Sequence, residues 1–171
     1  MNHYKILAFD PGTRYMGVAF IENEKLIYHG VKIIKPKNSP HEILQHVRKI
    51  VLRLIKDFKP RVIAAEKSFF GNNRKAALVN VVVMEIRAIA RRKQLKFVDY
   101  SPSTLKKFIT GNGRATKMEV SRAVVLNYPE LNVFLTQDRA WKERFHQNMF
   151  DAVALGIMAS TDSHRKNRLL S

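Results

Sequence analysis

Short apolar runs and helical stripes of apolar residues follow one another along the chain. Apolar or alternating runs predict strands at residues 5–9, 16–22, 25–34, 62–65 and 95–99. Apolar residues at every third or fourth position predict helices at residues 41–58, 73–93, 102–110, 117–126 and 147–161. Ser39 and Thr116 stand where N-caps are expected. Residues 128–145 fit neither pattern, because Pro129, Asn132 and Asp138 interrupt them.

The order of these elements predicts an α/β fold. The first three strands form a meander and are expected to pair antiparallel, with a tight turn at Asn23 and Glu24. The last two strands each follow a helix, which indicates parallel crossover connections. We therefore expect one domain, residues 1–161, built on a mixed five-stranded sheet flanked by helices. Residues 162–171 are predicted to be a disordered, basic tail.

The helix predicted at residues 73–93 is apolar around most of its circumference. Such a helix is either buried under neighbouring helices or shared with a partner, and a domain of this size has little room for the first arrangement. We therefore predict a homodimer. The candidate interface residues are Leu78, Val82, Ile86 and Ile89.

Charge narrows the choice of partner. The chain has 31 Lys and Arg residues against 14 Asp and Glu, a net charge of +17. This excess favours nucleic acid over an anionic membrane, since no predicted helix pairs a basic face with exposed aromatic residues. No apolar run is long enough to span a bilayer, and the first residues begin a core strand, so we expect a soluble, intracellular protein. The absence of cysteine excludes disulfides, thiolate zinc sites and cysteine nucleophiles.

Three carboxylates stand in positions suited to chemistry. Asp10 and Glu66 each end an apolar strand, and Asp151 lies on the last predicted helix. Asp10 could instead serve only as a turn residue, and Glu66 could pair with Lys67 or Arg74. If the two strands are neighbours, however, the three acids converge and repel one another unless divalent cations neutralise them. Oxygen ligands favour Mg²⁺ or Mn²⁺, and in a basic protein they suggest phosphodiester hydrolysis with two ions.

A glycine-rich basic turn, residues 111–117, precedes the helix predicted at residues 117–126. Taken alone, this pattern is more often a flexible connector. Beside a helix N-terminus in a strongly basic protein, its backbone N–H groups and Arg114 can approach a phosphate.

Together these motifs resemble the RuvC family of Holliday-junction resolvases, members of the RNase H-like superfamily. The resemblance rests on FDPGTRYMGVAF at residues 9–20, on Glu66 followed by Phe69, Phe70 and Asn73, on residues 111–117, and on DAVAL at residues 151–155. It implies an RNase H-like fold and a dimeric, metal-dependent endonuclease that nicks four-way DNA junctions symmetrically in recombination and repair. A branch-migration helicase is a further candidate partner, and the cytoplasm, nucleoid or a DNA-containing organelle is the expected location.

The resemblance also implies roles for individual residues. Asp10, Glu66 and Asp151 correspond to family metal ligands. Phe69, with Phe70 beside it, stands where an aromatic ring stacks on an unpaired base, although ordinary packing is the alternative. Lys106 and Lys117 match basic residues near the scissile phosphate, and Lys107 could replace Lys106. The remaining candidate DNA contacts are Asn73, Arg74 and Arg114.

Asn148 departs from the family pattern, which usually has an acid or His three residues before the last Asp. Its amide oxygen can coordinate Mg²⁺ but carries no charge and cannot act as a base. Asn148 is either a natural variant assisted by His146 or Glu143, or an Asp→Asn change that blocks cleavage.

Three other functions remain open at this point. A YqgF-type RNase H-like nuclease acting on RNA shares the opening motif. An actin-like ATPase also begins with Asp-x-Gly-Thr, but 171 residues cannot supply its second lobe. A non-catalytic junction-binding protein would need only the charge, the dimer symmetry and the stacking loop.

Overall fold

The computed structural model describes residues 4–34, 39–67, 73–135 and 140–168. Its strands are β1 (Lys5–Asp10), β2 (Tyr15–Glu22), β3 (Lys25–Ile33), β4 (Val62–Glu66) and β5 (Lys96–Tyr100). Its helices are α1 (Pro40–Phe58), α2 (Arg74–Arg92), α3 (Pro102–Thr110), α4 (Lys117–Asn127), the 3₁₀ helix η1 (Pro129–Phe134) and α5 (Ala140–Arg168).

The five strands form one mixed sheet, in the order β3-β2-β1-β4-β5. β1 pairs antiparallel with β2 and parallel with β4, and β4 pairs parallel with β5. The predicted mixed sheet is therefore confirmed. The two helices that precede β4 and β5 return the chain to the same edge of the sheet, so these strands run in the direction of β1.

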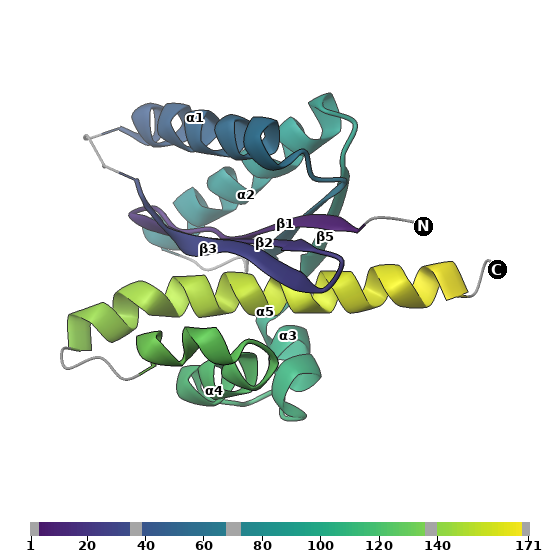
Figure 1. The fold of residues 1–171 in the computed structure, drawn as a ribbon. Helices are drawn as coiled ribbons and strands as arrows, with labels where there is room; N and C mark the ends of the chain where they lie inside the picture. The colour runs from purple at the N-terminus through teal and green to yellow at the C-terminus, as the bar shows by residue number, and fades with distance from the viewer. Residues whose placement is uncertain (1–3, 35–38, 68–72, 136–139, 169–171) are drawn as a thin grey trace.

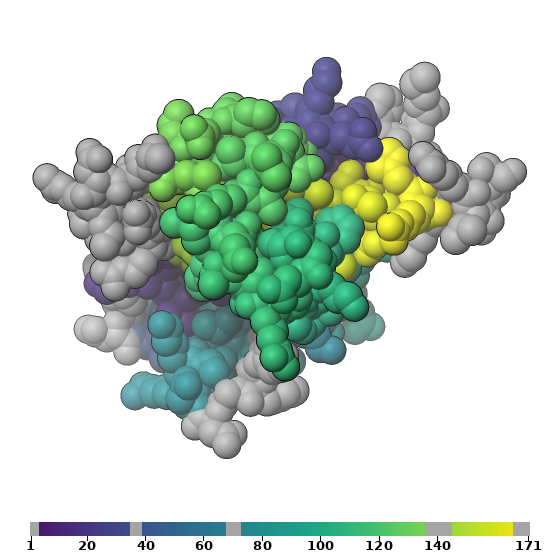
Figure 2. Space-filling view, turned by 90° about the horizontal axis from the view of Figure 1, so that it is seen from below, coloured from purple at the N-terminus to yellow at the C-terminus, as the bar shows by residue number. Residues whose placement is uncertain are grey.

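Helices cover both faces of the sheet (Figure 1): α1 and α2 lie on one face, and α5 with α3 and α4 on the other. Alternation along β1 divides the core accordingly. Leu7 and Phe9 pack with the α1 and α2 side, whereas Ile6 and Ala8 pack with the α5 side. Seen from that second side, α3 and α4 lie over α5, whose C-terminal part extends beyond them (Figure 2). Among the residues that the structure describes, no helix has the length and apolar character needed to cross a membrane.

The apolar helix α2 is buried mainly within its own chain, which corrects the predicted interface. Val82, Ile86 and Ile89 are at most 1% exposed and pack against α1 and the sheet, so these three side chains do not reach the surface. Leu78 is partly buried in the same cluster. The large apolar residues that α2 does expose are Val81 and Met84, at 41% and 68%.

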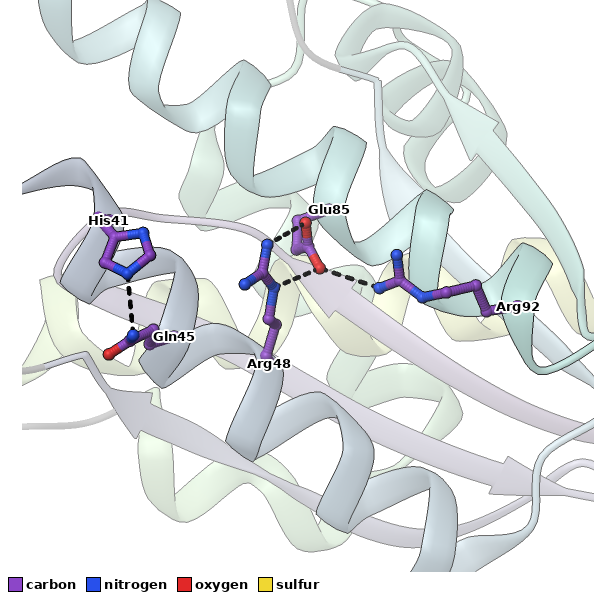
Figure 3. A network of polar contacts seen from close by, with 5 residues as sticks. All are labelled: His41, Gln45, Arg48, Glu85 and Arg92. Atoms are coloured by element: carbon purple, nitrogen blue, oxygen red, sulfur yellow. Dashed lines mark hydrogen bonds and ion pairs between the residues drawn. The ribbon is translucent and has the colours of Figure 1, made fainter.

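Polar contacts also tie α2 to α1 (Figure 3). Arg48 Nε on α1 donates to Glu85 Oε1 on α2 at 2.7 Å, and Arg48 Nη2 donates to Glu85 Oε2 at 3.2 Å. Arg92 Nη2 donates to the same Oε1 at 3.1 Å. Hydrogen bonds from Arg48 and Arg92 lower the pKa of Glu85, although partial burial opposes them. Glu85 thus stays ionised and holds the two helices in register.

The last helix is longer at both ends than the pattern predicts. α5 begins at Ala140 and runs to Arg168, so residues 162–168 continue the helix where a disordered tail was expected. Contacts with the rest of the chain explain the extension: Tyr100 Oη donates to Asp162 Oδ2 at 2.8 Å, and the His164 ring lies 4.3 Å from that of Tyr4. Residues 129–134, which the sequence left unassigned, form η1.

Candidate active site

Adjacent parallel strands bring Asp10 and Glu66 together. β1 pairs with β4 so that Phe9 stands opposite Ala65, and the next residue on each strand is the carboxylate. Both strands end at the same edge of the sheet, next to buried neighbours. The predicted convergence of these two acids therefore follows from the register alone.

The third acid reaches the same edge because α5 approaches β2 very closely. A Cβ atom on Gly17 would lie 1.7 Å from the Asn148 carbonyl oxygen, so only glycine fits there. Gly17 is itself the register partner of Asp10. The contact therefore sets Asn148 and, nearly one turn later, Asp151 beside the end of β1.

Asp10, Glu66, Asn148 and Asp151 all line one open cavity of about 420 Å³. The loop from Pro11 to Tyr15 forms one wall, and residues of α2, α3 and α4 complete the lining. The cations that line the cavity are Arg14, Lys75, Lys106 and Lys117. A site with acids at its base and cations at its rim is suited to a phosphate held over metal ions.

Burial raises the pKa values of all three carboxylates, and repulsion from neighbouring acids adds to the rise for Asp10 and Glu66. Burial raises the pKa of Asp10 well above its usual value, and the charges of Asp151 and Glu66 raise it further, against an opposing effect of Lys117. Burial also raises the pKa of Glu66 to about 7, with Asp151 adding to the rise while Lys117 and Lys106 oppose it. The pKa of Asp151 is raised by burial as well, although Lys117, a Gln147 hydrogen bond and Lys106 counteract the rise. Three partly buried acids with raised pKa values need nearby positive charge to ionise together.

The donor set fits a hard divalent cation, since carboxylate and amide oxygens are what Mg²⁺ prefers. In the part of the chain that the structure describes, however, no three acidic or imidazole groups lie close enough to hold one ion. The three acids therefore line the same cavity but do not all surround a single ion position. The chemistry of the donors supports a metal site, and the raised pKa values give a physical reason for one.

Of the predicted cations, Lys106 and Lys117 line the cavity and Lys107 does not. Lys117 begins α4 directly after the N-cap Thr116, which a capping box with Glu119 holds in place. Arg114 also lies outside the cavity lining, and its backbone N–H donates to Asn112 Oδ1 at 2.9 Å. The glycine-rich turn thus mainly positions Lys117.

The other predicted DNA contacts lie around the start of α2. Asn73 caps this helix, accepting from the Ala76 N–H at 2.8 Å, and lines a smaller hollow that shares Glu66 and Lys75 with the main cavity. Arg74 is exposed beside it and lines neither hollow. Phe69 and Phe70 fall outside the described residues.

His146, one of the two proposed helpers for Asn148, is not in the cavity lining. The His146 ring instead packs against Phe134 and Phe145, at 4.8 and 5.3 Å between ring centroids. The side chain of Glu143 lies outside the described residues. Asn148 itself lines the cavity, as a ligand position requires.

The sequence analysis did not predict the hydrogen bonds that connect Asp151 to Gln147 and Gln147 to Ser121. Gln147 Nε2 donates to Asp151 Oδ1 at 3.0 Å, and Ser121 Oγ on α4 lies 3.3 Å from Gln147 Oε1, to which it donates. Ser121 is buried and also contacts the Lys117 carbonyl oxygen at 3.1 Å. The spacing of Gln147 four residues before Asp151 was a usable signal. Its link to α4 depends on tertiary packing alone.

Arg14, Tyr15 and Lys75 are also cavity residues that sequence reasoning missed. Arg14 and Tyr15 lie within the opening motif, five residues or fewer after Asp10. Lys75 stands in the first turn of α2, where only the packing of that helix against β4 brings it to Glu66.

Comparison with known proteins agrees with this geometry. The sequence model described as crossover junction endodeoxyribonuclease RuvC matches residues 6–140. The chain belongs to the RuvC family. A RuvC of Prochlorococcus marinus (strain MIT 9312) is 33% identical over 134 residues, which cover 75% of this chain and 83% of the relative. A RuvC of Rickettsia bellii (strain RML369-C) is 28% identical over 140 residues, covering 79% and 89%.

Solved structures show the same fold. Thermus thermophilus RuvC in complex with a Holliday junction substrate superposes with a TM-score of 0.68 at 20% identity, covering 90% of each chain. The yeast mitochondrial Holliday junction resolvase gives a TM-score of 0.68 at 14% identity, covering 89% of this chain and 75% of that one. Membership of the RuvC family confirms the predicted RNase H-like fold and disfavours the RNA-nuclease and ATPase alternatives.

Proposed function

We propose that this chain is a structure-selective endodeoxyribonuclease that resolves four-way DNA junctions by metal-dependent nicking. The observation that carries the proposal is that three partly buried acids and two lysines, Lys106 and Lys117, line one open cavity. The choice of substrate rests on the related proteins named above. Their names describe them as crossover junction endodeoxyribonucleases, and one of them was solved in complex with a Holliday junction. The net charge of +17 suits a DNA substrate.

Asp10, Glu66, Asn148 and Asp151 would hold two Mg²⁺ or Mn²⁺ ions. Bound ions of this kind activate a water molecule and stabilise the leaving 3′ oxygen. Lys117 and Lys106 act on the phosphate itself: they draw it toward the acids and offset the negative charge that grows on its oxygens. Gln147 holds Asp151 in one orientation by its hydrogen bond, so that the carboxylate faces the cavity.

The proposal includes a homodimer, since paired nicks need two sites related by symmetry. The exposed Val81 and Met84 of α2 replace the buried residues first chosen for its interface. Phe69 and Phe70 as stacking residues, a helicase partner and the cellular location stay predictions.

The test of this function compares the chain with its Asn148→Asp variant on a labelled synthetic four-way junction in Mg²⁺. We expect paired nicks on the junction and none on a linear duplex of the same sequence. The variant adds a charged ligand, and we expect it to nick about 10-fold faster or more, which is the usual effect of changing a residue that holds a metal ion or orients one of its ligands. Single-turnover rates measure the difference.

A second variant, Asp10→Asn, serves as the inactive control in the same assay. Tight, junction-selective binding without nicking by either the chain or Asn148→Asp would leave a non-catalytic junction-binding protein. Nicking that Asp10→Asn does not abolish would point to a contaminating nuclease and contradict the assigned site.

A further inference from the structure

A row of aromatic rings runs from the edge of the catalytic cavity along the start of α5. Tyr15 and Phe145 pack in a T-shaped arrangement, with ring centroids 5.4 Å apart and planes at 79°. Phe145 in turn contacts His146 at 5.3 Å, and His146 contacts Phe134 at 4.8 Å. Phe134 ends the row against His29, at 5.5 Å. Three of these four contacts are T-shaped and the one between His146 and Phe134 is tilted, and together they hold each ring in a defined orientation.

Tyr15 is the member of this row that lines the cavity. It is the first residue of β2 and remains 36% exposed. Its backbone is fixed close to Asp10: a Cβ on Gly12 would meet the Tyr15 carbonyl oxygen at 2.1 Å, so the intervening turn is very tight. The preceding carbonyl, of Arg14, accepts from the Ile34 N–H at 2.8 Å. The Tyr15 residue is therefore held through its backbone and through its ring contact with Phe145.

We propose that Tyr15 stacks on a nucleobase of the strand being cut, beside the phosphate that the acids receive. This inference rests on the proposed nuclease function and adds a base-contacting residue to it. A partly exposed aromatic ring at the wall of a nucleic-acid site can stack on any base, because every base has a π-face. A ring already immobilised by its neighbours loses little conformational freedom when a base packs on it.

Stacking by Tyr15 positions the scissile phosphate rather than reacting with it. The acids and Lys117 lie in the same cavity, so a nucleotide whose base rests on Tyr15 keeps its phosphate over the carboxylates. The ring is what matters for this role, and the hydroxyl is dispensable. Phenylalanine should therefore replace Tyr15 fully, whereas an aliphatic residue of similar bulk should not.

Fluorescence of 2-aminopurine, placed in turn at each nucleotide flanking the nick, tests the proposal. Junctions carrying this base are bound in Ca²⁺ to slow cleavage, and binding is measured separately by anisotropy. We expect the unchanged chain and Tyr15→Phe to quench one labelled position. Tyr15→Leu and Tyr15→Ala should leave that position bright and slow single-turnover nicking about tenfold, as loss of one base–aromatic stack predicts.

Equal quenching by all four proteins at saturating junction would overturn the role of Tyr15. So would a loss of nicking in Tyr15→Phe, which would assign the effect to the hydroxyl. A merely structural role would lower the melting temperature of Tyr15→Leu while leaving its quenching intact. Failure of the unchanged chain to bind the junction at all would instead contradict the proposed function, so the two failures are distinguishable.

Discussion

Single residues set the electrostatics of the site. Burial and the charge of Asp151 raise the pKa of Glu66 to about 7 from an ordinary 4.5, while Lys117 and Lys106 limit the rise. A carboxylate whose pKa is raised in the folded chain binds a proton that the unfolded chain has already lost. The metal-free protein must therefore lose stability as the pH rises from 4.5 to about 7.

We predict that Glu66→Gln removes the part of this loss that Glu66 causes, while Asp10 and Asp151 keep their own contributions. Without metal, Glu66 should account for at most about 3 kcal/mol of the fall in the free energy of unfolding across that pH window, and the variant should show a flatter profile. Mg²⁺ at pH 7.5 should stabilise the unchanged chain and have less effect on Glu66→Gln. Urea unfolding with EDTA or Mg²⁺ measures both effects. Asp57→Asn, which alters a carboxylate 51% exposed, is the control and should keep the slope.

Packing between elements determines where Asn148 and Asp151 of α5 lie. Two glycines let this helix approach the sheet: Gly17 meets the Asn148 backbone, and Gly156 faces Ile21, whose Cδ1 would lie 2.8 Å from an added Cβ. The second neighbour is the end of a flexible side chain and can move. The first is helix backbone and cannot move without shifting Asn148 and Asp151.

Gly17→Ala should therefore be costly in both stability and activity. We expect a loss of about 3 kcal/mol or more in the free energy of unfolding, at the upper end for an overpacked core. Any folded fraction should bind Mg²⁺ weakly, since α5 must move away from β2. Gly30→Ala is the matched control, because an added Cβ there meets only the Tyr28 side chain at 3.4 Å. Comparable losses in the two variants would contradict this account of the crossing.

For the molecule as a whole, the exposed side of α2 is a surface that a second copy of the chain could cover. Val81 and Met84 stand three residues apart on the side of α2 that does not face the core, at 41% and 68% exposure. The buried side of the same helix is fully used by α1 and the sheet. A homodimer through α2 would therefore have to use the exposed side.

Met84→Glu should then convert the dimer to a monomer, because it sets a charge in an apolar interface. Sedimentation at micromolar concentration measures the change, and nicking should shift from paired to single cuts. Leu126→Glu on α4 is the control, since Leu126 is 85% exposed and far along the chain from α2. Equal sedimentation of the unchanged chain and Met84→Glu would place any dimer contact elsewhere.

Local pattern alone determined much of this protein. The five strands, the starts of α1 and α4 at Ser39 and Thr116, and the positions of Asp10 and Glu66 at strand ends all followed from residue spacing. These features depend on neighbours within a few residues, on side-chain alternation and on caps. The convergence of the two acids followed as well, because parallel strands end at one edge.

Only the tertiary structure decided which face of α2 is buried, how far α5 extends, and which side chains surround the acids. In the sequence, Val82 and Ile86 cannot be told apart from residues of a dimer interface. In the structure, they are buried in a cluster with residues of α1. The contacts of Gln147 with Ser121 and of Tyr100 with Asp162 join residues 26 and 62 positions apart. Lys75 reaches the cavity from a separate helix. Such contacts depend on how elements distant in sequence pack together, and no local pattern records that packing.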